Sequence, residues 1–280
     1  MAGLTKRVFL VAGILAVGLL GGCAVPGNGD SKSVRVMTYN IHHGEGADGV
    51  LDMDRIAEVI EASGADVVGL QEVDNNFGAR SEFVDQAKYL AEKLGMYYAY
   101  GPAIRYGGKD GERLYGNALL SRYPIAGTEN HLLAKFEGHE QRACLKARVE
   151  LAGDTYAVLV THLDHKSAEL RDEQAKGLIE IVGEQPERTI LMGDFNCPPP
   201  GTEAGDKQSV NAVARIIKTL DPACSIGGGP AEATVGSGVK IDYIFVSDDI
   251  ASNVVDCGPV RNDVTAKASD HLPVVAELKL

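Results

Sequence analysis

Hydrophobic residues recur along the chain with two periods, and each period predicts a different kind of element. Over residues 52–64, Ile56 and Ile60 lie on one face of a 3.6-residue period, which is typical of an amphipathic helix. Asp52 precedes this run as an N-cap, and Gly64 closes it. Shorter apolar runs bounded by turn residues predict strands instead. We predict helices over residues 52–64, 84–95, 167–183 and 210–220, and strands over residues 34–41, 66–73, 96–104, 117–122, 125–133, 143–151, 155–163, 189–192, 240–247, 253–258 and 272–280.

The order of these elements predicts the class of fold. Strands and helices alternate in the first and last thirds, whereas consecutive strands fill the middle of the chain. The link "AGD" at residues 152–154 contains a glycine and suits a tight hairpin between two of these strands. We therefore expect one α/β domain of about 250 residues, with two packed sheets and helices on the outside.

The N-terminal segment has a different pattern from the rest of the chain. A basic start, "MAGLTKR", precedes the apolar run "VFLVAGILAVGLL", whose 13 residues are fewer than the roughly 20 that span a membrane. A short apolar run behind a basic start is typical of a secretory signal. The next residues, "LGGC", resemble the lipobox of bacterial lipoproteins, so we expect lipidation of Cys23.

These features predict the domain boundaries and the location. We expect a signal peptide over residues 1–22, a flexible tether over residues 23–33, and the folded domain over residues 34–280. The protein would then be anchored by lipid in the cell envelope, on the outer side of a bacterial membrane. Cleavage elsewhere in the small-residue stretch 21–30 is the alternative, and it would give a secreted protein.

The charge of the chain argues against polyanionic partners. Removal of residues 1–22 takes away Lys6 and Arg7 and no acid, which moves the formal net charge from -12 to -14. A chain with this negative charge has no long-range electrostatic attraction to DNA or RNA. A divalent cation would reverse the sign locally, so nucleic acid is disfavoured as a partner without being excluded.

The cysteines left after lipidation allow several pairings. Cys144, Cys197, Cys224 and Cys257 remain, and four cysteines have three possible connectivities. We favour a Cys197–Cys224 disulfide, because both residues lie in loops beside predicted strand ends. Cys144 lies inside a strand-like run and is expected to be a small buried hydrophobe.

Acidic, amide and histidine side chains recur where predicted strands begin or end. Alone, an Asp or Asn at such a position is typical of a turn. Together, carboxylates and amides suit Mg²⁺ as ligands, and a histidine beside a carboxylate suits proton transfer near neutral pH. The residues at these strand ends are Asn40, Glu72, His162, Asp194, Asn196, Asp242, Asp270 and His271.

The motifs that carry these residues resemble the endonuclease/exonuclease/phosphatase superfamily, the deoxyribonuclease I-like group. They are, in order, "TYNIHHG", "GLQEVD", "YGNALLSRYP", "THLDH", "GDFN", "IDYIFVS" and "SDHLPV". The resemblance extends from about Val34 to the C-terminus. It implies a four-layer α-β-β-α sandwich of two mainly antiparallel mixed sheets, with the active site where strand ends converge.

The resemblance also implies a role for each residue. Glu72 would be the main ligand of Mg²⁺, or of Mn²⁺ as a substitute, with Asn40 and Asp270 close by. Asp194 would orient or deprotonate the attacking water, and Asn196 and His162 would hold phosphate oxygens. His271, oriented by Asp242, would stabilise the transition state or act as the base; the sequence leaves open which of Asp194 and His271 is the base.

Further candidates carry weaker signals. Arg80 and Arg142 match positions where small bacterial relatives carry a phosphate-binding arginine, with a surface ion pair as the alternative for each. Tyr115 and Asn117 would line the pocket, although Asn117 suits backbone hydrogen bonding equally well. His42, His43 and His165 lie near the site in sequence, and we expect them to shape it rather than to bind a metal.

The sequence thus predicts an exported, lipid-anchored, monomeric, magnesium-dependent phosphoesterase. A phosphodiester is favoured over a phosphomonoester as the substrate. The chain lacks tryptophan and a basic loop for tracking DNA, and so resembles the compact bacterial metal-dependent hydrolases of the family. The alternatives are a secreted nuclease acting on DNA or RNA and a surface binding module without catalysis. Loss of a residue such as Glu72 or His271 would favour the binding module, and neither is lost.

Overall fold

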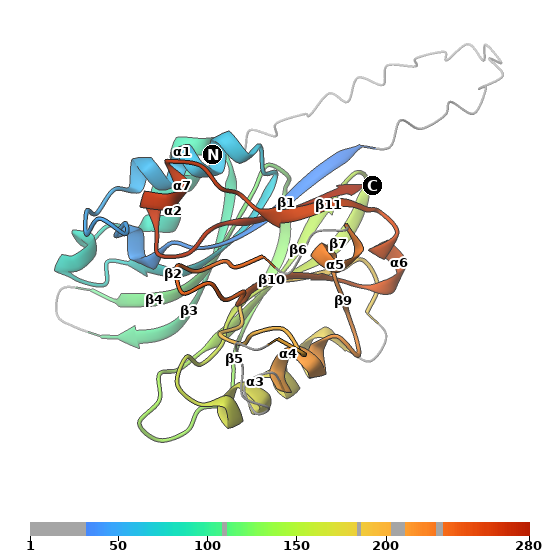
Figure 1. The fold of residues 1–280 in the computed structure, drawn as a ribbon. Coiled ribbons are helices and arrows are strands. Elements are labelled where there is room, and N and C mark those ends of the chain that lie inside the picture. Colours follow the sequence, from blue (N-terminus) through green and yellow to red (C-terminus); the bar gives the residue numbers. More distant parts are fainter. Residues whose placement is uncertain (1–31, 108–110, 184–185, 203–210, 228–231) are drawn as a thin grey trace, which may run out of the picture. The chain divides into compact units, whose positions relative to one another are not determined.

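Two six-stranded sheets form the centre of the protein (Figure 1). The computed structural model describes residues 32–107, 111–183, 186–202, 211–227 and 232–280. The first sheet has the order β11 (Val254–Pro259), β12 (Val274–Lys279), β1 (Ser33–Asn40), β2 (Val67–Asn75), β4 (Arg113–Ser121) and β3 (Tyr97–Tyr106). The second has the order β5 (Ile125–Leu132), β6 (Ala143–Leu151), β7 (Asp154–His162), β8 (Thr189–Asp194), β10 (Asp242–Val246) and β9 (Asp221–Pro222). One parallel pair occurs in each sheet, β1–β2 and β7–β8, and the other pairs are antiparallel.

Helices cover the outer faces of the two sheets. The longer ones are α1 (Met53–Ser63), α2 (Gln86–Leu94), α3 (Ala168–Val182) and α4 (Asn211–Ile216). Short turns of helix connect strands elsewhere: η1 (His42–Gly44), η2 (Ala79–Ser81), α5 (Ala223–Ile226), α6 (Asp248–Ala251) and α7 (Thr265–Ala268).

Alternation along the strands creates the four layers, because successive side chains point to opposite faces of a sheet. In β1, Val36 packs between the sheets and Met37 packs outward against α1 and α2. In β8, Ile190 packs between the sheets and Leu191 packs outward against α3 and α4. The predicted α-β-β-α sandwich with mainly antiparallel mixed sheets is therefore confirmed.

Local signals in the sequence also fix the ends of some elements. The Asp52 side chain accepts a hydrogen bond from the backbone N–H of Arg55 and caps α1, and Gly64 ends that helix in the left-handed conformation. Ala152 and Gly153 both have positive φ, as a two-residue hairpin between β6 and β7 requires.

Some predicted boundaries differ from the structure. Strand β4 begins at Arg113 rather than at residue 117, because its pairing with β3 starts at Arg113 and its pairing with β2 starts at Leu114. Helix α4 ends at Ile216 rather than at residue 220.

The predicted Cys197–Cys224 disulfide is wrong, because Cys224 pairs with Cys257. Cys224 in α5 packs into the core between the sheets, where Cys257 of β11 also lies. Cys197 is buried in the outer core under α3 and α4, on the opposite face of the second sheet. Cys144 is buried, as predicted.

The predicted signal peptide, the lipidated Cys23 and most of the tether lie outside the described residues. Within the described ranges, no helix is both long and apolar enough to cross a membrane.

Candidate active site

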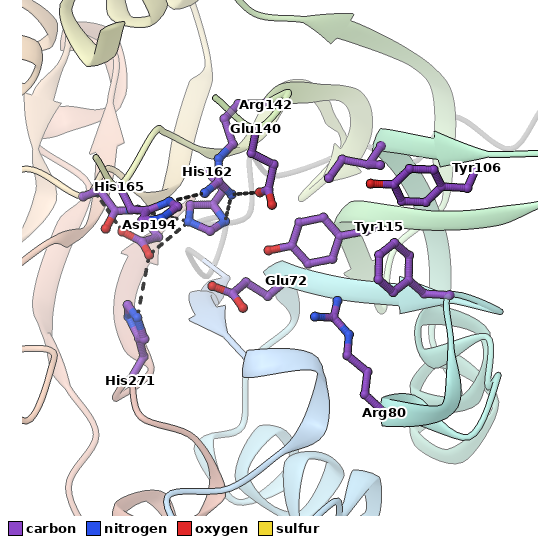
Figure 2. Close-up of a pocket in the computed structure, with 13 residues that line it drawn as sticks. Glu72, Arg80, Tyr106, Tyr115, Glu140, Arg142, His162, His165, Asp194 and His271 are labelled. Carbon is purple, nitrogen blue, oxygen red and sulfur yellow. Dashed lines mark hydrogen bonds and ion pairs between the residues drawn. The ribbon is translucent and has the colours of Figure 1, made fainter. Parts of the chain in front are cut away.

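A polar pocket of about 400 Å³ opens where strand ends of both sheets meet (Figure 2). Glu72 enters it from β2 in the first sheet, and Asp194 enters it from β8 in the second. Its lining residues are Glu72, Phe77, Arg80, Ile104, Tyr106, Tyr115, Glu140, Arg142, His162, His165, Asp194, Asn196 and His271.

Strand register brings three of the predicted residues together. The parallel strands β7 and β8 end side by side, with His162 opposite Asp194. Strand β10 runs antiparallel to β8, so its first residue, Asp242, lies opposite the last residue of β8, Asp194. Three residues that are far apart in the chain therefore become neighbours at one edge of the second sheet.

The residues of the stretch "GDFN", at positions 193–196, have identifiable structural roles. A Cβ on Gly193 would lie 2.0 Å from the carbonyl oxygen of Thr161, so only glycine fits there. Phe195 points away from the pocket and packs on the rings of Tyr243 and Phe245. Asn196 has a φ of 47°, a left-handed conformation that asparagine tolerates, and its backbone N–H donates to Oδ1 of Asp194 at 2.8 Å.

Asp194, His271 and Asp242 form a buried chain of ionisable groups. Nδ1 of His271 lies 3.0 Å from Oδ2 of Asp242, and Nε2 of His271 lies 3.7 Å from Oδ2 of Asp194. Burial would lower the pKa of His271, but the Asp242 and Asp194 carboxylates overcome it and raise that pKa to about 10. Burial, followed by the charge of Asp242, raises the pKa of Asp194 to about 7.

His162 is neutral, and a neighbouring arginine fixes its tautomer. Arg142 donates to Nδ1 of His162 at 2.8 Å, and an arginine cannot accept a hydrogen bond. The ring hydrogen is therefore on Nε2, which lies 3.5 Å from Oδ2 of Asp194. In this tautomer, Nε2 of His162 and Nδ2 of Asn196, which are 3.0 Å apart, are both donors and do not bond to each other. Burial and the charge of Arg142 hold the pKa of His162 well below its usual value.

Arg142 itself is buried in the pocket wall. Its other contacts are with Nδ1 of His165 at 3.1 Å and with a carboxylate oxygen of Glu140 at 3.1 Å. The guanidinium is thus committed to two histidines and a glutamate. It supports His162 and also borders the pocket.

Asn40 links the two acids of the site. Its Nδ2 lies 3.1 Å from a carboxylate oxygen of Glu72 and 3.1 Å from Oδ2 of Asp194. Its Oδ1 accepts a hydrogen bond from the backbone N–H of His42. The NH₂ group of the Asn40 side chain therefore faces the site, and its carbonyl oxygen does not.

Glu72 occupies an irregular position in its strand. The pairing of β2 with β4 shifts register between Leu70 and Val73, and Glu72 has a φ of 58° within this bulge. Bulges near active sites re-aim a side chain, and here the bulge accompanies a carboxylate that borders the pocket.

Four residues predicted for the site do not line the pocket. Asn40 and Asp242 contact lining residues, as described above, and the other two are Asp270 and Asn117. Asp270 is exposed, contacts the hydroxyl of Ser269, and lines a neighbouring cavity. Asn117 is buried and donates to the carbonyl oxygen of Ala143 and, at 3.4 Å, to that of Val160. Because Asn117 belongs to the first sheet and its acceptors to the second, it connects the two sheets, as the alternative interpretation proposed.

Arg80 and Tyr115 lie on the opposite side of the pocket from His271 (Figure 2). Arg80 forms two hydrogen bonds to the buried carboxylate of Asp74, at 2.7 and 2.9 Å. Its guanidinium carbon lies 4.5 Å from the ring centre of Phe77 and 5.4 Å from that of Tyr115. The arginine is therefore held by an acid and flanked by aromatic rings.

Four lining residues were not predicted from the sequence. These are Phe77, Ile104, Tyr106 and Glu140. Phe77 follows "GLQEVD" and Glu140 precedes Arg142, so proximity to recognised motifs was their only signal. Ile104 and Tyr106 lie at the end of β3 and look like ordinary strand residues.

Two groups of described residues bring three potential metal-ligating atoms within 4.8 Å of one another. One is Asp194, Asp242 and His271, whose side chains already pair with each other. The other is His42, His43 and Glu72, beside the pocket. Carboxylate and imidazole ligands for a divalent cation are thus present at the site.

Comparisons with known proteins agree with this geometry. The uncharacterized protein YbhP of Escherichia coli K12 is 28% identical over 270 residues, which cover 91% of this chain and 100% of that protein. A crystal structure from Beutenbergia cavernae, described as an endonuclease/exonuclease/phosphatase, has a TM-score of 0.72 and 28% identity, covering 89% of this chain and 72% of that one. The mannosyl-6-phosphatase Bt3783 of Bacteroides thetaiotaomicron shares the fold, with a TM-score of 0.66, 22% identity, and coverage of 88% and 100%.

The family profile described as "Endonuclease/Exonuclease/phosphatase family" matches residues 37–271. This match covers most of the chain and includes every residue of the pocket. It confirms the resemblance that the motifs carry. The chain belongs to the endonuclease/exonuclease/phosphatase family and is a metal-dependent hydrolase that acts on phosphoric ester bonds.

Proposed function

We propose that the protein is a magnesium-dependent phosphoesterase that hydrolyses a small phosphodiester, or a phosphomonoester, by in-line attack of water. The buried carboxylate of Asp194 carries this proposal. Its Oδ2 lies 3.5 Å from Nε2 of His162 and 3.7 Å from Nε2 of His271. The carboxylate of Asp194 supplies a proton acceptor, and the two imidazoles supply hydrogen-bond donors. Glu72, which lines the same pocket, supplies a metal ligand.

Glu72 fits the role of magnesium ligand. Its carboxylate borders the pocket, and Asn40 holds one of its oxygens at 3.1 Å. Mg²⁺ prefers carboxylate oxygen, and Mn²⁺ accepts the same ligands. Bound there, the cation would act as a Lewis acid on a phosphoryl oxygen.

We assign the general base to Asp194 rather than to His271. The pKa of Asp194 is raised to about 7, by burial and then by Asp242, so its carboxylate accepts a proton from water near neutral pH. Asp242 and Asp194 offset the effect of burial and raise the pKa of His271 to about 10, so His271 carries a proton under the same conditions. The protonated imidazole donates to negative charge that develops on the phosphorus oxygens.

Two further donors would hold the phosphate. The Nε2–H of His162 and the side-chain amide of Asn196 border the pocket beside Asp194. Because both groups are neutral, they bind oxygens without cancelling the charge of the Asp194 base. Their hydrogen bonds would strengthen as charge moves onto those oxygens in the transition state.

The pocket favours a small ester. A volume of about 400 Å³ suits one small molecule rather than a polymer. The similarity in fold to a protein described as a mannosyl-6-phosphatase is a reason to include sugar phosphates among the substrates tested.

We also propose export and a lipid anchor at Cys23. The basic start, the 13-residue apolar run and "LGGC" support this proposal. The test is the fraction of the protein that sediments with membranes, compared between the wild type and Cys23→Ser. We expect the variant to leave the membrane fraction, and equal sedimentation of both proteins would contradict the anchor.

The activity test uses bis-p-nitrophenyl phosphate and p-nitrophenyl phosphate with Mg²⁺, with Mn²⁺ and with chelator. We expect metal-dependent turnover that falls at least about 10²-fold in His271→Ala, which corresponds to roughly 3 kcal/mol or more. His131→Ala is the matched control, because His131 pairs with Glu129 on β5 and does not line the pocket.

The outcomes separate the proposal from its rivals. Turnover that survives His271→Ala would place the reaction elsewhere. Cleavage of DNA or RNA in preference to both small esters would favour the nuclease. Absence of turnover with every ester would leave the binding module as the better explanation.

A further inference from the structure

A second group of ligating side chains lies beside Glu72. One ring nitrogen of His42, one of His43 and a carboxylate oxygen of Glu72 all lie within 4.8 Å of one another. The two histidines belong to the turn η1, which directly follows β1, and their rings meet edge to face with centres 4.6 Å apart. The proposed phosphoesterase mechanism uses Glu72 and neither histidine.

The ring of His42 is oriented by a backbone carbonyl. Its Nδ1 lies 3.2 Å from the carbonyl oxygen of Glu45, and a carbonyl only accepts hydrogen bonds. Nδ1 therefore carries the ring hydrogen, and Nε2 keeps its lone pair. Metal-binding histidines have this arrangement, in which the second ring nitrogen donates to a carbonyl or a carboxylate.

The ring of His43 has the complementary arrangement. Its Nε2 lies 3.6 Å from a carboxylate oxygen of Glu45, whereas its Nδ1 is buried and has no hydrogen-bond partner among the described residues. The residue is only 7% exposed. A buried nitrogen without a partner is unfavourable, and a cation bound through Nδ1 would satisfy it.

We propose that His42, His43 and Glu72 form a binding site for a divalent transition-metal ion, with Glu45 as the residue that orients both imidazoles. Two imidazole nitrogens and one carboxylate suit Zn²⁺ and similar ions better than Mg²⁺, which prefers oxygen. Three protein ligands leave a position open for water or substrate. The inference rests on the proposed function only through the shared Glu72, because binding of the ion requires no turnover.

The test is isothermal titration of the tag-free protein with Zn²⁺ and, separately, with Mg²⁺. We expect the protein to bind Zn²⁺ more tightly than Mg²⁺. The affinity for Zn²⁺ should fall at least about 10-fold in His42→Ala and in His43→Ala. Glu45→Gln, which changes only the orienting carboxylate, should weaken Zn²⁺ about 10-fold. His131→Ala, a histidine paired with Glu129 on β5, should bind as the wild type does.

A spectroscopic readout identifies the ligands directly. With Mn²⁺ bound, electron spin-echo modulation should show coupling to imidazole nitrogen, and the His42→Ala/His43→Ala double variant should lack it. Because His43 is buried, His43→Ala is checked for folding by circular dichroism. The half-buried His42 provides the test alone if that variant unfolds.

Two results would overturn the site: unchanged Zn²⁺ affinity in His42→Ala, or loss of Zn²⁺ binding in His271→Ala with full binding in His42→Ala. The second result would assign the ion to the Asp194 group instead. The experiments also distinguish failure of the metal site from failure of the proposed phosphoesterase activity. Magnesium-dependent ester hydrolysis without histidine-dependent Zn²⁺ binding overturns the inference alone. Histidine-dependent Zn²⁺ binding without hydrolysis supports the inference and overturns the phosphoesterase.

Discussion

The two sides of the pocket are built differently (Figure 2). We name each side for the role proposed for it. The catalytic wall consists of His162, Asp194, Asn196 and His271, and the recognition wall consists of Phe77, Arg80, Tyr106 and Tyr115. The first wall is polar, and its Asp194 is 1% exposed, whereas the second is aromatic and cationic, and its Tyr106 is 55% exposed.

The difference lies in what holds each wall in place. Backbone pairing sets the catalytic wall, because Asp194 lies opposite His162 in β7 and opposite Asp242 in β10. Ring contacts hold the recognition wall, such as those of Phe77 with Tyr106 and Tyr115, each with centres 5.8 Å apart. A fixed wall suits groups that act in the transition state, and an exposed wall suits contacts that select a substrate. Changes in the first should therefore lower kcat, and changes in the second should alter KM and preference.

The largest effect is expected for Asp194→Asn. The amide cannot accept the proton from water, so kcat for bis-p-nitrophenyl phosphate should fall about 10²–10⁴-fold, the usual contribution of a general base. The fold should survive, because the side chains have the same size, and circular dichroism provides that control. A kcat within 10-fold of the wild type would show that the catalytic wall does not supply the base.

The next effect is expected in the pH dependence of kcat. Asp194 must be deprotonated, so activity should rise with pH through about 7, or lower where a bound cation favours the carboxylate. His271 must be protonated, so activity should fall as pH rises through about 10.

Asp242→Asn tests the cause of the alkaline limb. Without the carboxylate that overcomes burial, the pKa of His271 should fall, and the limb should move to lower pH by at least about one unit. A profile between pH 6 and 11 measures both limbs. An alkaline limb that stays in place in Asp242→Asn would assign it to another group.

The catalytic wall could be predicted from the sequence because its signal is local. Each residue ends or begins a strand within a short motif, and glycine or asparagine appears where the backbone requires it, as at Gly193 and Asn196. The resemblance to the family then supplied the roles. The fold class followed in the same way, from the alternation of apolar and polar positions along the strands.

The features that could not be predicted depend on packing between segments that are distant in the chain. Nothing in the sequence separates Tyr106, which lines the pocket, from Tyr97 at the other end of β3. Asn117 faces the second sheet rather than the pocket, because β4 packs there. Cys224 and Cys197 lie on opposite faces of one sheet, a separation that local patterns do not encode.

A smaller effect is expected on the recognition wall for Arg80→Lys. Lysine keeps the charge and loses the paired hydrogen bonds to Asp74 and the planar contact with Phe77. We expect KM to rise about 10-fold with kcat nearly unchanged, because one charge-assisted contact contributes roughly 1.5 kcal/mol in both ground and transition states. Arg105→Lys is the control, since Arg105 is exposed on β3 and pairs with Glu112 outside the pocket. A fall in kcat without a change in KM would show that Arg80 acts in the transition state, as the residues of the catalytic wall are proposed to do.

The smallest effect is expected for Tyr106→Ala, and it concerns preference rather than rate. An exposed aromatic ring that contacts a substrate contributes about 0.5–1.5 kcal/mol, so KM for aromatic esters should rise roughly 2–10-fold. Esters with small alkyl groups cannot reach the ring and should be unaffected. Tyr97→Ala is a close control, because Tyr97 lies on the same strand with 56% exposure against 55% for Tyr106 and does not line the pocket. Equal changes in KM for aromatic and alkyl esters would mean that the exposed ring does not select the substrate, and the recognition wall would then reduce to Arg80 and its buried neighbours.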